Sequence, residues 1–205
     1  MRTIPREVSR CGNRDDPVET TRRLLRSKTC SELRMYILGA LHDATFNIKH
    51  KTYRFSQSSV DWLKLVQKIL SKMGNESWIY KEGKSRHVFA LETSAKIDRT
   101  EKPETQGEKI AYVRGYFDAE GGMPKSNSHF LYFQFSQKDK LDLSEVRQWL
   151  TELGITCGKI HNPSKKVDDS YWRFFISRRS HNDFMHKINS WHPRKMRQIE
   201  LRMKI

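Results

Sequence analysis

The chain has 205 residues, of which 36% are hydrophobic and 11% aromatic, enough for the core of one large domain or two small ones. Charged residues make up 31%, and they alternate with aromatic and aliphatic residues, which argues against a disordered protein. The formal net charge of +15 favours a polyanionic partner, nucleic acid first and an anionic membrane second.

The cysteine pattern argues against a secreted protein. Cys11, Cys30 and Cys157 are widely spaced and form no C-x-x-C pair, so neither a disulfide framework nor a structural zinc site is expected. No apolar run approaches the ~20 residues of a membrane span, and the polar N-terminus lacks a signal-peptide core. We therefore expect an intracellular protein that is neither secreted nor bound to a membrane.

The first part of the chain predicts a polar extension over residues 1–30 and a structured half over 31–97. Ser31 is a candidate N-cap for the first helix, because apolar residues recur at helical spacing after it. The elements expected from periodicity are a helix over 31–43, a strand over 51–57, a helix over 59–73, and strands over 77–81 and 86–92.

The second part repeats this order after a polar linker over residues 98–108. The expected second half, 109–205, contains a helix over 108–119, a strand over 130–137, a helix over 144–153, strands over 157–161 and 171–177, and a helix over 180–190. The basic tail after residue 190 has the composition of a last helix, for which phosphate contact and capping of the second half are both open.

Three pairs of segments show that the two halves are an internal duplication. Residues 36–42 (YILGALH) resemble 112–118 (YVRGYFD), and 53–57 (YRFSQ) match 133–137 (FQFSQ). An amphipathic helix and a hairpin follow in each half. We therefore predict an α/β (α+β) fold of two half-domains related by a pseudo-twofold axis, each an antiparallel sheet with helices on one face and an open basic face.

The segment Gly115-Tyr-Phe-Asp-Ala-Glu-Gly121 resembles the LAGLIDADG motif with Glu as its last acid, and residues 36–46 resemble a degenerate first copy. The resemblance covers residues 31–190 and is to the single-chain, two-motif LAGLIDADG homing endonucleases. In that family the two motif helices pack together through small residues, here Gly39, Ala40 and Gly115. Each helix ends by placing an acid at the bottom of a saddle-shaped DNA-binding groove.

The resemblance implies that paired carboxylates hold Mg²⁺ (or Mn²⁺) against the scissile phosphates. Glu120 matches the motif directly, but alignment of the motif glycines puts Ala44 opposite it. The nearest acid is Asp43, and one residue on a regular helix is a rotation of ~100°. Because the helix ends there, we predict that Asp43 turns inward as the second metal ligand, with Ala44 and Ala119 as adjacent metal-site positions. Without Asp43, the enzyme could nick one strand or have lost cutting.

Two further residues occupy matching places just before these acids. Asp118 is predicted to be a helix-end or interface residue rather than a metal ligand. His42, its counterpart in the first copy, is predicted to be a packed or capping histidine rather than a general base.

Strand parity and the resemblance together predict the other catalytic residues. Gln57 and Gln137 share parity with the aromatic residues two positions before them, so they point towards the helices. The family has a water-positioning polar residue here, although a buried glutamine satisfied by backbone is the alternative. Lys138, which has no basic counterpart in the first half, and Arg173, on the last strand, match basic residues that assist catalysis.

The opposite parity and the hairpins predict the DNA-binding surface, where Arg and Gln suit base edges and Lys suits phosphates. The predicted contacts are Lys49, Lys51, Arg54, Ser56, Lys81, Lys84, Arg86, Tyr132, Gln134, Ser136, Lys159, His161, Lys165 and Lys166.

The sequence therefore predicts a monomeric, magnesium-dependent double-stranded DNA endonuclease. By resemblance, it would cut a long, nearly asymmetric site across the minor groove and leave 3′ overhangs. Two alternatives on the same fold stay open: a maturase that binds intron RNA to assist splicing, and a DNA-binding protein that does not cut.

Overall fold

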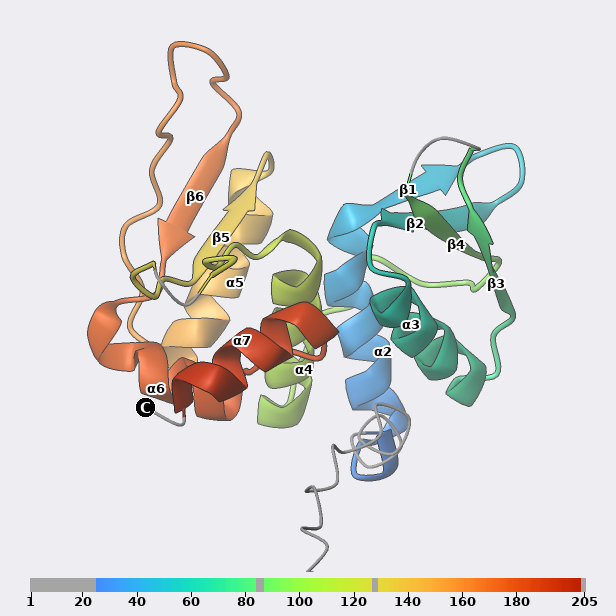
Figure 1. The fold of residues 1–205 in the computed structure, drawn as a ribbon, viewed down its shortest axis with the longest axis horizontal. Helices are drawn as coiled ribbons and strands as arrows, with labels where there is room; N and C mark the ends of the chain where they lie inside the picture. Colours follow the sequence, from blue (N-terminus) through green and yellow to red (C-terminus); the bar gives the residue numbers. More distant parts are fainter. Residues whose placement is uncertain (1–24, 84–86, 127–128, 204–205) are drawn as a thin grey trace, which may run out of the picture.

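A computed structural model describes residues 25–83, 87–126 and 129–203 (Figure 1). The first half contains α2 (Cys30–Ala40), the 3₁₀ helix η1 (Leu41–Asp43), β1 (Ala44–Asn47), β2 (Thr52–Gln57), α3 (Val60–Lys72), β3 (Ser77–Lys81) and β4 (Phe89–Thr93). The second contains α4 (Gln106–Glu120), β5 (Gln134–Gln137), α5 (Lys140–Glu152), β6 (Trp172–Phe175), the 3₁₀ helix η2 (Arg178–Ser180), α6 (His181–Lys187) and α7 (Pro193–Met203). Among the described residues, no helix combines the length and the hydropathy of a membrane span.

The two halves have the same strand order, which confirms the predicted mixed fold. The first sheet has the antiparallel order β1-β2-β4-β3. In the second half, β5 pairs with β6. Isolated bridges add Gly122 beside Gln134 and His161 beside Arg173, in the places of β1 and β3. The predicted strand 130–137 is thus shorter than expected, and the predicted strand 157–161 is reduced to isolated bridges at Cys157 and His161, because regular pairing is confined to residues 134–137 and 172–175.

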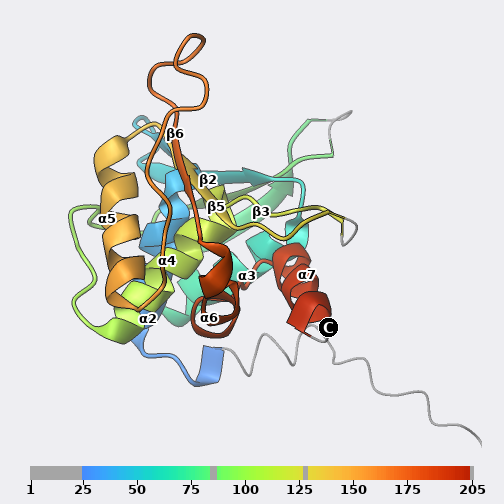
Figure 2. The same ribbon diagram turned by 90° about the vertical axis from the view of Figure 1, so that its left-hand side faces the viewer.

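Helices α2 and α4 lie side by side at the centre of the molecule, with one sheet on either side of them (Figures 1 and 2). A Cβ placed on Gly39 would be 2.0 Å from the Tyr112 carbonyl oxygen, and one on Gly115 would be 2.0 Å from the Tyr36 carbonyl oxygen. Only glycine therefore permits this approach at both positions. The paired helices bring their C-terminal ends to the same place between the sheets.

Matching capping residues begin these two helices. Thr29 caps α2 with Glu32, and Thr105 caps α4 with Glu108, so both starts are capping boxes. The predicted N-cap Ser31 was therefore wrong by two residues, and its hydroxyl instead donates to Glu108 of the other helix.

The apolar face of each amphipathic helix forms the core. In the first half, Trp62 of α3 packs edge-on against Phe55 of β2, with ring centroids 6.1 Å apart. In the second, Phe135 of β5 stacks on Phe174 of β6 at 5.1 Å. Each fully buried large apolar side chain stabilises the fold by roughly 1.5–3 kcal/mol. The opposite faces of the sheets stay open.

Candidate active site

The ends of α2 and α4 position Asp43 and Glu120, the two acids predicted to share a metal. Helix α4 stays α-helical through Glu120, whereas α2 becomes the 3₁₀ helix η1 over its last three residues. A 3₁₀ helix rises about 2.0 Å per residue, whereas an α-helix rises about 1.5 Å. The distance along the helix axis is therefore about 7.5 Å both from Gly39 to Asp43 and from Gly115 to Glu120. A 3₁₀ helix also turns about 120° per residue, so the difference between the directions of the two acids around their helix axes falls from about 100° to about 40°. The tighter winding therefore compensates for the missing residue in the first copy.

The electrostatics of the two acids show that their charges interact. Burial and, to a smaller extent, the nearby Asp43 carboxylate together raise the pKa of Glu120 to about 7. Burial also raises the pKa of Asp43, while a hydrogen bond from Gln57 and the charge of Lys195 lower it. Two half-buried carboxylates that repel each other favour either a proton or a cation between them.

Lys195 of α7 is a buried cation beside these acids that periodicity did not reveal. Its ammonium donates to the backbone carbonyls of Phe117, Asp118 and Gly121, the last two at 3.1 and 2.7 Å. Its three protons are thereby used to cap the C-terminus of α4, where a positive charge is favourable. Burial lowers its pKa to about 8. The basic tail thus caps the second half, and a lysine in an arginine-rich tail gives no sequence signal of such a role.

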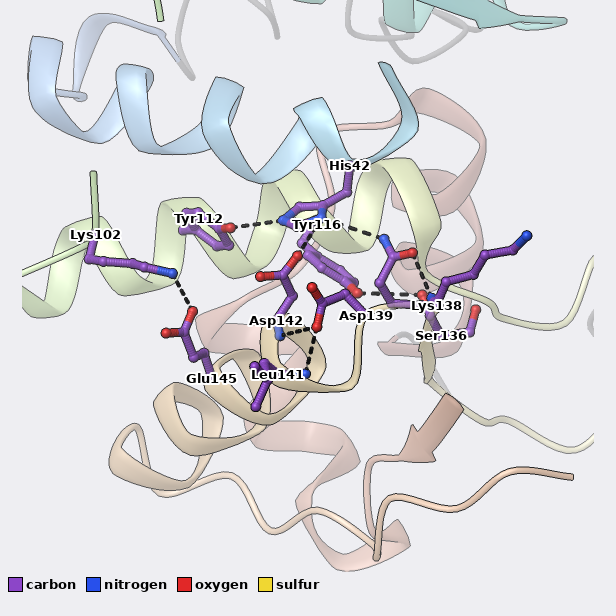
Figure 3. Close-up of polar contacts among 11 residues, drawn as sticks. His42, Lys102, Tyr112, Tyr116, Ser136, Lys138, Asp139, Leu141, Asp142 and Glu145 are labelled. Carbon is purple, nitrogen blue, oxygen red and sulfur yellow. Dashed lines mark hydrogen bonds and ion pairs between the residues drawn. The ribbon is translucent and has the colours of Figure 1, made fainter. Parts of the chain in front are cut away.

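The two predicted glutamines lie at the helix ends, on the side of the sheets that parity predicts. Gln57 donates to the Asp43 carboxylate. Gln137 lies 3.5 Å from Nδ1 of His42, and its side-chain oxygen accepts from the Lys138 backbone at 2.7 Å. The Lys138 side chain points away from this cluster (Figure 3).

His42 links the first half to α4 and α5 (Figure 3). Its Nε2 lies 2.8 Å from the hydroxyl of Tyr112, and its Nδ1 lies 3.7 Å from the Asp142 carboxylate. Burial lowers the pKa of His42 to about 4, so near neutral pH the imidazole is uncharged and the contact with Asp142 is not an ion pair. This is the packed histidine that the sequence predicts.

Asp118 is fully buried at the interface between the two halves. Its carboxylate accepts hydrogen bonds from the hydroxyl of Tyr36 at 2.7 Å, from the hydroxyl of Ser190, and from the backbone amides of Trp191 and His192 at 2.9 and 3.1 Å. These donors occupy the carboxylate, which leaves it an interface residue rather than a metal ligand.

The donor set fits a hard divalent cation that also binds phosphate. Within the described ranges, no cluster of three or more His, Cys, Asp or Glu side chains could hold a metal by itself. Mg²⁺ is commonly held by one or two carboxylates together with water and substrate phosphates. Asp43 and Glu120 supply such a pair. Ala44, which begins β1 with extended backbone, and Ala119 adjoin them.

The open face of the first sheet carries an ion-pair network. Arg54 lies between Glu82 at 2.9 Å and Glu92 at 4.0 Å, and Tyr80 donates to Glu92. Arg54 and the exposed Ser56 thus lie on the predicted face, but the arginine is already paired. Lys81 shares strand parity with Ile79, which packs on the core, so it projects from the helix side at the strand end. Of the other predicted contacts in this half, Lys49 and Lys51 are exposed in the β1–β2 turn, and Lys84 and Arg86 lie outside the described residues.

The open face of the second half gathers most of its predicted residues. Ser136 pairs in register with Arg173, whose Nε donates to His161 at 3.4 Å. Gln134 donates to Tyr171, and Tyr132 packs edge-on against Phe175. Arg173 therefore lies among the predicted DNA contacts, on the opposite side of the sheet from Gln137. Exposed lysines complete this surface at positions Lys159, Lys165 and Lys166.

Comparisons with known proteins agree with this architecture. Residues 107–189 match a family model described as a LAGLIDADG-like domain. No curated protein sequence matches the chain. The solved structure of I-DmoI in complex with DNA and Mn has 22% identity and a TM-score of 0.60, over 78% of this chain and 98% of that one. Full-length DUF199/WhiA from Thermatoga maritima has 16% identity and a TM-score of 0.66, over 91% of this chain and 66% of that one. The N-terminal LAGLIDADG domain of DUF199/WhiA has 15% identity and a TM-score of 0.65, over 86% of this chain and 91% of that one. At these identities, the structural matches establish a shared fold.

Proposed function

Because residues 107–189 match a LAGLIDADG-like domain and the chain shares the fold of I-DmoI, we propose that it is a LAGLIDADG protein and a site-specific double-stranded DNA endonuclease that requires a divalent metal. The family includes proteins solved with DNA and with Mn, Mg or Ca, among them I-DmoI. One observation supports cutting in particular. The 3₁₀ helix at the end of α2 brings Asp43 level with Glu120 along the helix axes, despite the one-residue offset in the motif.

The proposed reaction uses the two acids as the metal-binding pair. When bound, a divalent cation such as Mg²⁺ or Mn²⁺ supplies a polarised phosphoryl oxygen and an acidified water. Asp43 and Glu120 must both be ionised to hold it, and Gln57 orients the Asp43 carboxylate by donating to it. Gln137 occupies the corresponding strand end in the second half, where we propose that it positions water. Lys195 holds the end of α4 in place and lowers the pKa of Glu120.

The proposed substrate is one long, nearly asymmetric duplex bound by a monomer across both open faces. The net charge of +15 supports contact with many phosphates. The two faces differ, since the first carries the Arg54–Glu82–Glu92 network and the second carries Arg173 with His161. A protein with two unlike faces should prefer a site with unlike halves. By analogy with the family, cutting both strands across the minor groove would leave 3′ overhangs.

The test selects cleaved sites from a randomised duplex library in the presence of Mg²⁺. We expect the wild type to cut both strands at one long site. Glu120→Gln and Asp43→Asn should each lose at least one strand cut and keep binding, because each removes one charge from the pair without changing its shape. Glu200→Gln, on the exposed side of α7, is the matched acid-to-amide control and should cut normally.

Two results would separate the alternatives on this fold. A site that the wild type enriches by binding but never cuts would replace the endonuclease by a DNA-binding protein. Binding of structured intron RNA in preference to every duplex would favour a maturase.

A further inference from the structure

The tips of three hairpins expose large apolar side chains to solvent. Phe130 is 95% exposed, Val167 92% and Ile48 83%. One exposed apolar residue on a surface needs no explanation. Here, however, the pattern occurs at the β1–β2 turn, at its counterpart before β5, and at the loop before β6. In Figure 1 the loop before β6 extends beyond the sheets, and it lies on the other side of α2 and α4 from the β1–β2 turn.

The tips that carry Val167 and Ile48 are held by hydrogen bonds. The Val167 and Asp168 amides donate to the Ser164 carbonyl at 2.7 and 2.8 Å. Asn162 donates to the Asp168 carbonyl at 2.8 Å, which closes the turn. The turn that contains Ile48 is closed by the His50 amide, which donates to the Asn47 side chain at 3.2 Å. The backbone that carries each apolar side chain is therefore already ordered, which lowers the entropic cost of binding.

Charge at the same tips identifies the partner. Lys165 and Lys166 precede Val167, and Lys49 and Lys51 follow Ile48, all four exposed. Lysines of this kind contact phosphates and position the protein on the duplex, which brings the aliphatic side chain beside them within reach of the groove. In the major groove, the apolar group on the base edges is the C5 methyl of thymine.

We propose that Ile48 and Val167 contact thymine methyl groups in the major groove on opposite sides of the centre of the bound duplex, and so specify thymine at those positions. This inference rests on the proposed function, because it requires duplex DNA across both sheets. It assigns a sequence preference to residues outside the sheets and outside the catalytic site.

The test begins with duplex sites selected by binding, without divalent metal, by the wild type and by Ile48→Ala and Val167→Ala. The wild type should enrich thymine at one position or more on each side of the centre. Ile48→Ala should lose that preference on one side only, and Val167→Ala on the other. Because both side chains are exposed, neither variant should unfold.

Replacement of single thymidines by deoxyuridine, which removes only the methyl group, then tests the contact itself. At the enriched positions, wild-type affinity should fall about fourfold, as expected for the loss of one buried methyl group. Each alanine variant should be indifferent to deoxyuridine on its own side. Leu141→Ala changes an equally apolar residue on α5 that is 77% exposed, and it should respond like the wild type.

The outcomes distinguish this inference from the proposed function. A site with no thymine preference, or a deoxyuridine effect that survives in both alanine variants, overturns the contact and leaves the proposed function intact. Failure to enrich any duplex overturns both.

Discussion

The hydroxyl of Tyr36 on α2 donates to the Asp118 carboxylate near the end of α4, at 2.7 Å. Tyr112 and His42 make the corresponding contact across the pseudo-twofold axis, at 2.8 Å. Each motif helix thus carries a tyrosine that contacts a side chain near the C-terminal end of the neighbouring helix. The repeat has kept the geometry of this contact while its chemistry has diverged, from a carboxylate with several donors to a single neutral histidine.

Tyr36→Phe should therefore destabilise the protein more than Tyr112→Phe. Loss of the Tyr36 hydroxyl removes a donor to buried Asp118 and an acceptor for the Trp62 indole at 3.0 Å, about 2 kcal/mol together. Loss of the Tyr112 hydroxyl removes one neutral hydrogen bond, about 1 kcal/mol. Urea denaturation at neutral pH measures both, and equal effects would mean that Asp118 does not depend on Tyr36.

Gly39→Ala should separate the central helices. The new Cβ would be 2.0 Å from the Tyr112 carbonyl oxygen and 2.7 Å from the Tyr116 amide, both backbone atoms that cannot move alone. We expect a loss of about 3 kcal/mol. Gly158→Ala, whose Cβ would have its nearest neighbour at 3.4 Å, is the control and should change little. Thermal unfolding of both variants checks this, and a stable Gly39→Ala protein would contradict the close approach.

Glu120→Gln should stabilise the metal-free protein at high pH. The folded-state pKa of Glu120 is raised to about 7, so between about pH 4.5 and about pH 7 the folded state holds a proton that the unfolded state has lost. Stability therefore falls as pH rises through this window, and that loss is absent from the amide. Melting temperatures in a chelator should agree near about pH 5 and favour the variant near about pH 8. A variant less stable at the higher pH would mean that Glu120 gains from ionising in the folded protein.

The sequence predicted the order of elements, because the duplication repeats apolar periodicity that burial requires. It also predicted the position of Gln57, since strand parity follows from the pleat alone. It did not reveal β1, whose residues are mostly exposed and lack an alternating pattern. The 3₁₀ end of α2 and the burial of Lys195 were equally hidden, because both depend on contacts with distant parts of the chain.

Lys195→Met should weaken both the fold and the site. It removes the donor to the Phe117, Asp118 and Gly121 carbonyls, and buried carbonyls left without partners should cost about 3 kcal/mol. Lys195 also lowers the pKa of Glu120, so its loss should raise that pKa further. The pH midpoint of cleavage, measured at subsaturating metal below the melting temperature, should then move upward because the proton competes better with the metal for Glu120. An unchanged midpoint would limit Lys195 to a structural role.

Glu92→Gln should increase the affinity for DNA. Glu92 and Glu82 both neighbour Arg54 on the open face of the first sheet, so the carboxylates compete with phosphate for the guanidinium. With one carboxylate removed, Arg54 can take an additional phosphate. The slope of log affinity against log salt should steepen by about 0.9, the value for one more neutralised phosphate. Glu145→Gln makes the same change at an acid that pairs with Lys102 on the helical side, and it should leave the slope unaltered. If both variants shift the slope equally, net charge alone governs binding and the first sheet makes no direct contact with the duplex.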